Sequence, residues 1–154
     1  MWQRIQTLFL ALIIVSMVGL LLLPIWVSQP DSANEHQLYA FHYTEKSIDG
    51  NKTQYIPYCI TAVLAIAAAT VSAISIKSYK NRPLQMRLGL LNSLLMLGVM
   101  VSVVVFVTDL ASTHTEAQYG LGFWLIASGV ACNFVANRFI RRDEQLVKDS
   151  DRLR

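Results

Sequence analysis

The stretch SIKSYKNRPLQMRL, residues 75 to 88, decides how this chain folds. It contains four basic residues, Lys77, Lys80, Arg82 and Arg87, and no acidic one. A long apolar run flanks it on each side. Because short loops rich in lysine and arginine stay on the cytoplasmic side of a membrane, the stretch predicts a turn between two membrane-spanning helices and places that turn inside.

Four apolar segments are long enough to cross a bilayer, for which a helix needs about 20 residues. Two of them flank the basic stretch, at residues 57–76 and 88–108, and the outer two cover residues 8–27 and 120–140. A secretory signal peptide is the alternative for the first segment, but it is long for one and ends in PIWVSQP without a small-residue cleavage site. We therefore predict an all-α membrane protein, a four-transmembrane-helix bundle.

The composition agrees with a membrane-embedded chain. Of its 154 residues, 54% are hydrophobic and only 15% are charged, which is too apolar for a soluble domain of this length. The length predicts a single membrane domain over residues 1–154. The net charge of +3 does not indicate a nucleic-acid partner. The basic residues are segregated to one side of the predicted membrane and do not gather on one face of a globular domain.

The distribution of basic residues predicts the orientation. Only Lys46 and Lys52 lie in the outer loop 28–56 and the third loop, and the other eleven of the 13 basic residues lie in the opposite segments. Both termini are therefore expected in the cytoplasm. The polar tail, residues 141–154, is predicted to continue the last helix. The headgroup layer is expected to contact Lys77, Lys80, Arg82, Arg87, Arg138, Arg141 and Arg142; specific lipid binding or a docked protein partner is the alternative.

Small and polar residues predict how the helices pack. Ala65, Ala69 and Ala73 recur every four residues, with Ala68 and Ser72 beside them, and predict a close-packed seam. Asn92, Asn133 and Asn137 fall in the same half of the bundle if the last two spans are antiparallel, with Gln3, Gln6 and Gln85 nearby. We interpret this polar cluster as interhelical hydrogen bonds. A transporter site is the alternative, but no span contains His, Asp or Glu, which ion transport usually requires.

The outer loop 28–56 contains an alternating aromatic pattern. Tyr39, Phe41 and Tyr43 would share one face of an extended strand. Asp49-Gly50 is a favourable turn pair, and residues 53–56 could return antiparallel to place Tyr43 opposite Ile56. The pattern predicts a β-hairpin packed on the helix ends, with a disordered loop as the alternative. Trp26 is expected as an interfacial anchor.

Three segments resemble a known family: MWQRIQTLFL at residues 1–10, YKNRPLQMRL at residues 79–88 and IRRDEQLVKDSDRLR at residues 140–154. They are similar to the bacterial four-helix membrane proteins grouped as the domain of unknown function 4293 family. The resemblance implies an integral protein of the bacterial inner membrane. It implies no activity, cofactor or site residue.

Other candidate sites are weak. The three histidines, His36, His42 and His114, fall in the outer segments, but their spacing gives a metal site no support. Cys59 and Cys132 lie too far apart along their helices for a thiol oxidoreductase. We expect no catalytic, cofactor or metal site. The expected function is a non-enzymatic scaffold or accessory subunit of an inner-membrane assembly, with membrane lipids and a membrane-protein partner or a second copy as ligands; a small transporter or a lipid-binding protein is the alternative.

Overall fold

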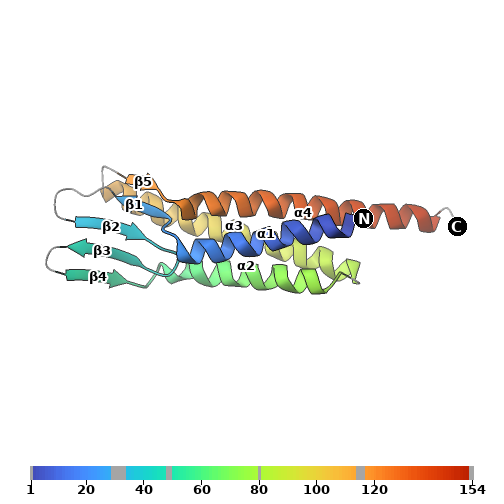
Figure 1. The fold of residues 1–154 in the computed structure, drawn as a ribbon, viewed down its shortest axis with the longest axis horizontal. Helices are drawn as coiled ribbons and strands as arrows, with labels where there is room; N and C mark the ends of the chain where they lie inside the picture. Colours follow the sequence, from blue (N-terminus) through green and yellow to red (C-terminus); the bar gives the residue numbers. More distant parts are fainter. Residues whose placement is uncertain (1, 29–33, 48–49, 80, 114–116, 153–154) are drawn as a thin grey trace.

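The computed structural model describes residues 2–28, 34–47, 50–79, 81–113 and 117–152. The elements follow in the order α1 (Trp2–Leu22), β1 (Trp26–Ser28), β2 (Asn34–Leu38), β3 (Tyr43–Ser47), β4 (Gly50–Gln54), α2 (Cys59–Lys77), α3 (Arg82–Thr113), β5 (Ala117–Tyr119) and α4 (Leu121–Arg152). The helices lie side by side along the long axis, and the strands gather at one end (Figure 1). We call this the sheet end, and the opposite end, with the α2–α3 turn, the basic end.

All four helices are long and apolar enough to cross a membrane, as predicted. This indicates a multi-pass membrane protein. The predicted bounds of the first span were wrong, because α1 runs from Trp2 to Leu22 and not over residues 8–27. The helix ends before Leu23 since a residue that precedes a proline, here Pro24, is disfavoured in the helical conformation. α3 extends beyond its predicted span at both ends. α4 begins one residue later than predicted and continues into the polar tail as far as Arg152, as predicted.

The four helices form a closed ring in chain order. α1 packs against α2 and α4, and α3 packs against the same two helices. The interior is apolar toward the sheet end, and its fully buried side chains include Ile13, Met17, Leu20, Val99 and Val103. The burial of these side chains supplies tight van der Waals packing, which drives helix association where lipid is as apolar as the protein.

The small-residue seam of α2 agrees with the prediction at Ala65, Ala68 and Ser72 and differs from it at Ala73. Ala62, Ala65, Ala68 and Ser72 are buried, whereas Ala73 is exposed. Each step of four residues turns a helical face by about 40°, because the helix has 3.6 residues per turn. A stripe that keeps facing one neighbour therefore alternates steps of three and four.

The strands form one five-stranded antiparallel sheet in the order β4-β3-β2-β1-β5. The predicted register was wrong: Tyr43 pairs with Gln54, not with Ile56, and Ser47 pairs with Gly50. Gly50 has a φ of 134°, a conformation that favours glycine. Asp49 lies outside the described residues.

Two further expectations for this region were wrong. Tyr39 and Phe41 do not lie in a strand with Tyr43, because the chain reverses between β2 and β3, where Tyr39 N–H donates to the His42 carbonyl at 2.9 Å. Trp26 is no interfacial anchor. It lies in β1 with 1% of its surface exposed.

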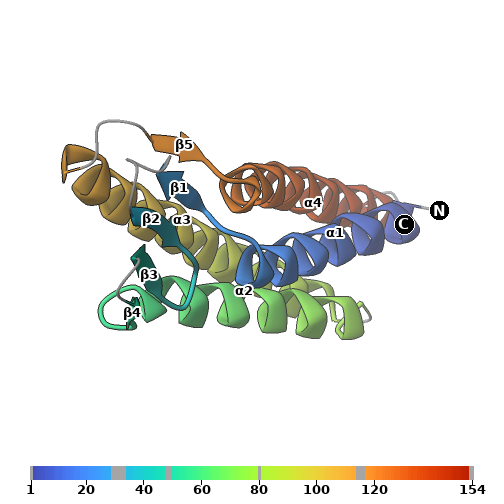
Figure 2. The same cartoon turned by 60° about the vertical axis from the view of Figure 1, so that its left-hand side comes forward.

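The sheet packs on the part of α3 nearest Thr113, which runs beside the strands in both views (Figures 1 and 2). Tyr58 joins the two layers, since its ring contacts Tyr43 of β3 and Phe106 of α3. β5 connects the last loop to the first by pairing with β1. This close approach requires Gly120, because a Cβ there would clash with the backbone of Pro24.

Candidate functional site: a cleft between α3 and α4

A cleft of about 850 Å³ lies between α3 and α4. Its apolar walls include Leu94 and Leu97 of α3 and Phe134 of α4, which are 60%, 58% and 70% exposed. The cleft therefore opens to the surroundings of the bundle and not to its interior. The full lining consists of Leu90, Ser93, Leu94, Met96, Leu97, Met100, Val130, Asn133, Phe134, Asn137, Arg138, Arg141, Arg142 and Gln145.

The polar part of this lining is a hydrogen-bonded network that joins the two helices. The Asn92 side-chain amide donates to Asn133 Oδ1 at 2.9 Å, and Asn133 in turn donates to Ser93 Oγ at 2.9 Å. Asn137 Nδ2 donates to Ser93 Oγ at 2.8 Å and to the Gly89 carbonyl at 3.2 Å. The three asparagines singled out in the sequence thus meet around Ser93.

Sequence reasoning missed Ser93, although a signal was available. Ser93 follows Gly89 by four residues, so both lie on one face of α3, and its hydroxyl donates to the Gly89 carbonyl at 3.0 Å. Gly89 allows the two helices to approach closely, because a Cβ there would clash with the side chain of Asn137. A glycine and a serine four apart, facing an asparagine, are typical of a tight polar helix contact.

Basic side chains line the end of the cleft nearest the basic end. Arg138 lies one turn before Arg141 and Arg142 on α4, and all three are exposed. Arg87 precedes Leu90 by three residues and therefore lies on the same face of α3 as the apolar wall. Lys77 is exposed at the end of α2 and does not line the cleft. Lys80 and the side chain of Arg82 lie outside the described part of the chain.

Further polar side chains are buried between the helices toward the basic end. Gln6 of α1, Ser72 and Ser75 of α2 and Gln85 of α3 are all less than 9% exposed. Within the described residues, four buried atoms have no hydrogen-bond partner: Gln6 Nε2, Ser72 Oγ, Ser75 Oγ and Asn92 Oδ1. Such atoms reduce stability by their desolvation cost. The buried polar groups in the basic half of the bundle are therefore less completely hydrogen-bonded than those in the sheet half. The side chain of Gln3 lies outside the described residues.

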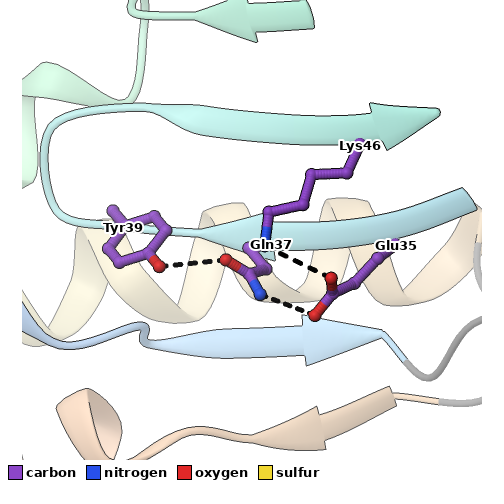
Figure 3. A network of polar contacts seen from close by, with 4 residues as sticks. All are labelled: Glu35, Gln37, Tyr39 and Lys46. Carbon is purple, nitrogen blue, oxygen red and sulfur yellow. Dashed lines mark hydrogen bonds and ion pairs between the residues drawn. The ribbon is translucent and has the colours of Figure 1, made fainter. Parts of the chain in front are cut away.

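The sheet end contains a separate polar network on the face of the sheet that points away from α3 (Figure 3). Gln37 donates to Glu35 Oε1 at 2.6 Å, Lys46 forms an ion pair with Glu35 at 3.3 Å, and the Tyr39 hydroxyl donates to Gln37 at 2.9 Å. The hydrogen bonds from Gln37 and Lys46 lower the pKa of Glu35. This network links β2 to β3 and is open to solvent.

The histidines of the sheet end are engaged with aromatic residues. His36 Nδ1 lies 2.6 Å from the Tyr43 hydroxyl, and His42 packs between Tyr39 and Tyr55. Burial raises the pKa of Tyr43 to about 12, with a contribution from the charge of Glu45. His114 lies outside the described residues, and among the residues that the structure does describe, no group of three or more His, Cys, Asp or Glu could hold a metal ion.

The two cysteines are both free thiols in α2 and α4. Cys59 is the first residue of α2, and Cys132 lies eleven residues beyond the start of α4. A hydrogen bond between Thr61 and Ser102 joins α2 to α3, and one between Ser16 and Ser128 joins α1 to α4. These hydroxyl pairs fix the helices to one another.

No curated protein matches the chain in a sequence comparison. A family description does match, and it covers residues 2–153, nearly the whole chain. The matched segment includes all four helices, the sheet and the lining of the cleft. The chain therefore belongs to the family described as Domain of unknown function (DUF4293).

Proposed function

We propose that this protein is a non-enzymatic accessory subunit of an assembly in the bacterial inner membrane, with both termini in the cytoplasm. The observation that supports this most is the end of α4, which continues past the start of α1 (Figure 1). Asn137 lies beside Gly89, so in an antiparallel pair Glu144 lies about level with Arg82, the first residue of α3. Residues 146–152, beyond the lining of the cleft, then form a helix about 10 Å long outside the bundle.

This extension is suited to docking. It contains Lys148, Asp149, Asp151 and Arg152, so charges of both signs occur close together. Charges arranged in a pattern contribute more to the choice of partner than to the affinity of binding. Leu146 is 53% exposed on the same helix and gives the surface an apolar contact. A helical extension without packed neighbours gains stability when a partner covers it.

The orientation follows from the excess of basic residues at the basic end. Lys77, Arg87, Arg138, Arg141 and Arg142 all belong to the described residues of that end, whereas Lys46 and Lys52 belong to the sheet. We accordingly place the sheet in the periplasm. The basic residues then lie at the membrane boundary, where lipid headgroups neutralise them, and this is the reason that we propose no nucleic-acid partner.

A non-enzymatic role agrees with the polar groups of the bundle. The buried polar side chains of the described residues are amides and hydroxyls, whereas acid–base or nucleophilic catalysis requires positioned groups of suitable pKa. A small transporter is the alternative. It is less favoured because the ring of helices encloses packed apolar side chains, among them Met17, Met96 and Val99, instead of a path lined by ionisable groups.

The experiment is affinity purification in a mild detergent, followed by mass spectrometry. We expect the full chain to retain a partner protein in stoichiometric amount and a chain ending at Gln145 to lose it. The Lys46→Gln/Lys52→Gln variant, changed at the opposite end, is the control and should retain the partner. If the full chain purifies alone and its proteoliposomes take up a solute, the accessory role is wrong and the transporter replaces it.

A further inference from the structure

We propose that the α3–α4 cleft binds one anionic glycerophospholipid from the leaflet at the basic end. An acyl chain lies along Leu94, Leu97 and Met100, and the phosphate contacts Arg138 and Arg141. This inference goes beyond the proposed function and does not depend on a protein partner.

The dimensions of the cleft fit one leaflet. Its lining on α4 runs from Val130 to Gln145, which corresponds to about 22 Å of helix. Half of a hydrocarbon core is about 15 Å thick, so the cleft spans an acyl chain together with its headgroup. Its volume of about 850 Å³ lies in the range of about 300–1,000 Å³ that is usual for small-molecule sites.

The chemistry of the lining changes along the cleft as a phospholipid does. The end nearest the middle of the bundle is formed by apolar side chains, including Leu97, Met100 and Val130. Asn137 and Ser93 follow at the centre, one turn before Arg141, at the depth where the glycerol esters of a lipid lie. The arginines come last. A ligand with an apolar tail, a polar neck and a charged head matches this order.

The arginines select for negative charge. Arg138 and Arg141 are three residues apart and therefore neighbours on one face of α4. Both line the cleft and both are exposed. A guanidinium group presents a planar fork of donors that fits two phosphate oxygens at once. Since no acidic residue lines the cleft among the described residues, a lipid with net negative charge is favoured over one whose phosphate is balanced by its own cation.

A second copy of the chain is a poorer occupant. Two copies inserted in the same direction are related by an axis along the membrane normal, and such an interface brings the same residues face to face. Arg138 and Arg141 of one copy would then approach the same arginines of the other. Like charges in an interface disfavour association, whereas an anionic lipid neutralises them.

The test is native mass spectrometry of the full-length protein in detergent, titrated with phosphatidylglycerol or with phosphatidylcholine of the same acyl chains. Wild type is expected to bind one phosphatidylglycerol at least ten-fold more tightly than phosphatidylcholine. The Arg138→Gln/Arg141→Gln variant should lose about 25-fold in affinity for phosphatidylglycerol, or about five-fold for each arginine. Leu94→Trp, which fills the exposed apolar wall but keeps every charge, should also lose at least ten-fold.

The matched control is Lys52→Gln/Lys77→Gln, which removes two exposed cations that do not line the cleft. It should bind within two-fold of wild type. Equal losses in the control and in the arginine variant would mean unspecific surface attraction, and equal binding of both lipids by wild type would mean annular lipid; either result overturns the proposal. So does a dimer that Leu94→Trp dissociates, because a second copy then occupies the cleft. A chain ending at Gln145, which keeps the whole lining of the cleft, should still bind the lipid, which separates this test from that of the accessory role.

Discussion

At the scale of single residues, Tyr43 shows how the sheet is attached to the helices. Its hydroxyl lies 2.6 Å from His36 Nδ1 on the neighbouring strand, and its ring contacts Tyr58 directly before α2. The side chain is half-buried. Its uncharged form is therefore the one that the folded protein accommodates, because burial disfavours a phenolate.

This predicts a loss of stability at alkaline pH. The pKa of Tyr43 is about 12 in the fold and about 10 in an unfolded chain. A pKa that is higher in the folded than in the unfolded chain contributes stability, and this contribution is complete below pH 10, the pKa of the unfolded chain. It is lost as the pH rises from 10 through 12. Tyrosinate absorbance should show a late-titrating group, accompanied by loss of the near-ultraviolet circular dichroism of the sheet. Burial also raises the pKa of Tyr58, so Tyr43→Phe should lose one late-titrating tyrosine and keep another; an unchanged late absorbance would contradict the assignment.

At the scale of elements, the contact between α3 and α4 depends on hydrogen bonds between side chains. Asn92 is 2% and Asn133 5% exposed, and Asn133 bonds both to Asn92 and to Ser93. Removing one amide leaves a buried donor or acceptor on the other helix without a partner, which costs more than the bond itself contributes.

A double-mutant cycle measures this coupling. Asn92→Ala and Asn133→Ala should each reduce the free energy of unfolding by about 1–2 kcal/mol, and the double variant should lose less than the sum of the two. The coupling energy is expected at about 0.5–1.5 kcal/mol, as for other hydrogen bonds between membrane helices. Unfolding in increasing fractions of a denaturing detergent provides the measurement. Strictly additive losses would show that the two amides do not interact.

The elements also show how far the sequence predicts the fold. Length and hydropathy were sufficient to predict four helices. The antiparallel arrangement of the last two helices was sufficient to predict that Asn133 lies near Asn92. The hairpin was expected, but its register was not, because turn preference alone centred the turn on Asp49-Gly50 whereas Gly50 already belongs to β4. β5 was missed altogether. Its pairing with β1 joins Trp26 to Tyr119, and a strand of three residues is too short to give a local signal for such a distant partner.

The cleft could not be predicted from the sequence for a similar reason. Arg138, Arg141 and Arg142 were expected at the headgroup layer as separate cations, and the asparagines as a separate cluster. Their arrangement along a single groove depends on how far Gly89 lets α4 approach α3 and on the direction of side chains such as Phe134. Those are properties of packing, and a periodic pattern in the chain does not contain them.

At the scale of the whole molecule, polarity runs from one end to the other. The sheet end has an apolar helix core, and buried polar side chains and cationic residues follow toward the basic end. Both termini of the chain lie at the basic end (Figure 1). An even number of membrane-crossing helices places the two termini on the same side.

Reporter fusions test the orientation that we propose. Fusions after residues 50, 82, 115 and 154 should report the periplasm, the cytoplasm, the periplasm and the cytoplasm in that order. The reason is that basic residues are concentrated at the turn before α3 and in the tail. A phosphatase active only outside and a fluorescent protein that folds only inside give opposite readouts at each position. The reversed order would invert the topology, and any mixed order would contradict four crossings.

The pairing of β1 with β5 has a mechanical consequence. α1 and α4 are the two neighbouring helices that no loop connects directly, and β1 follows the first of them as β5 precedes the second. The strands run along the same axis as the helices (Figure 1). A pull on the tail of α4 is therefore transmitted to this strand pair as shear. All three residue pairs of the ladder resist this force together: Trp26 with Tyr119, Val27 with Gln118 and Ser28 with Ala117. The sheet acts as a tether against sliding of the last helix out of the bundle.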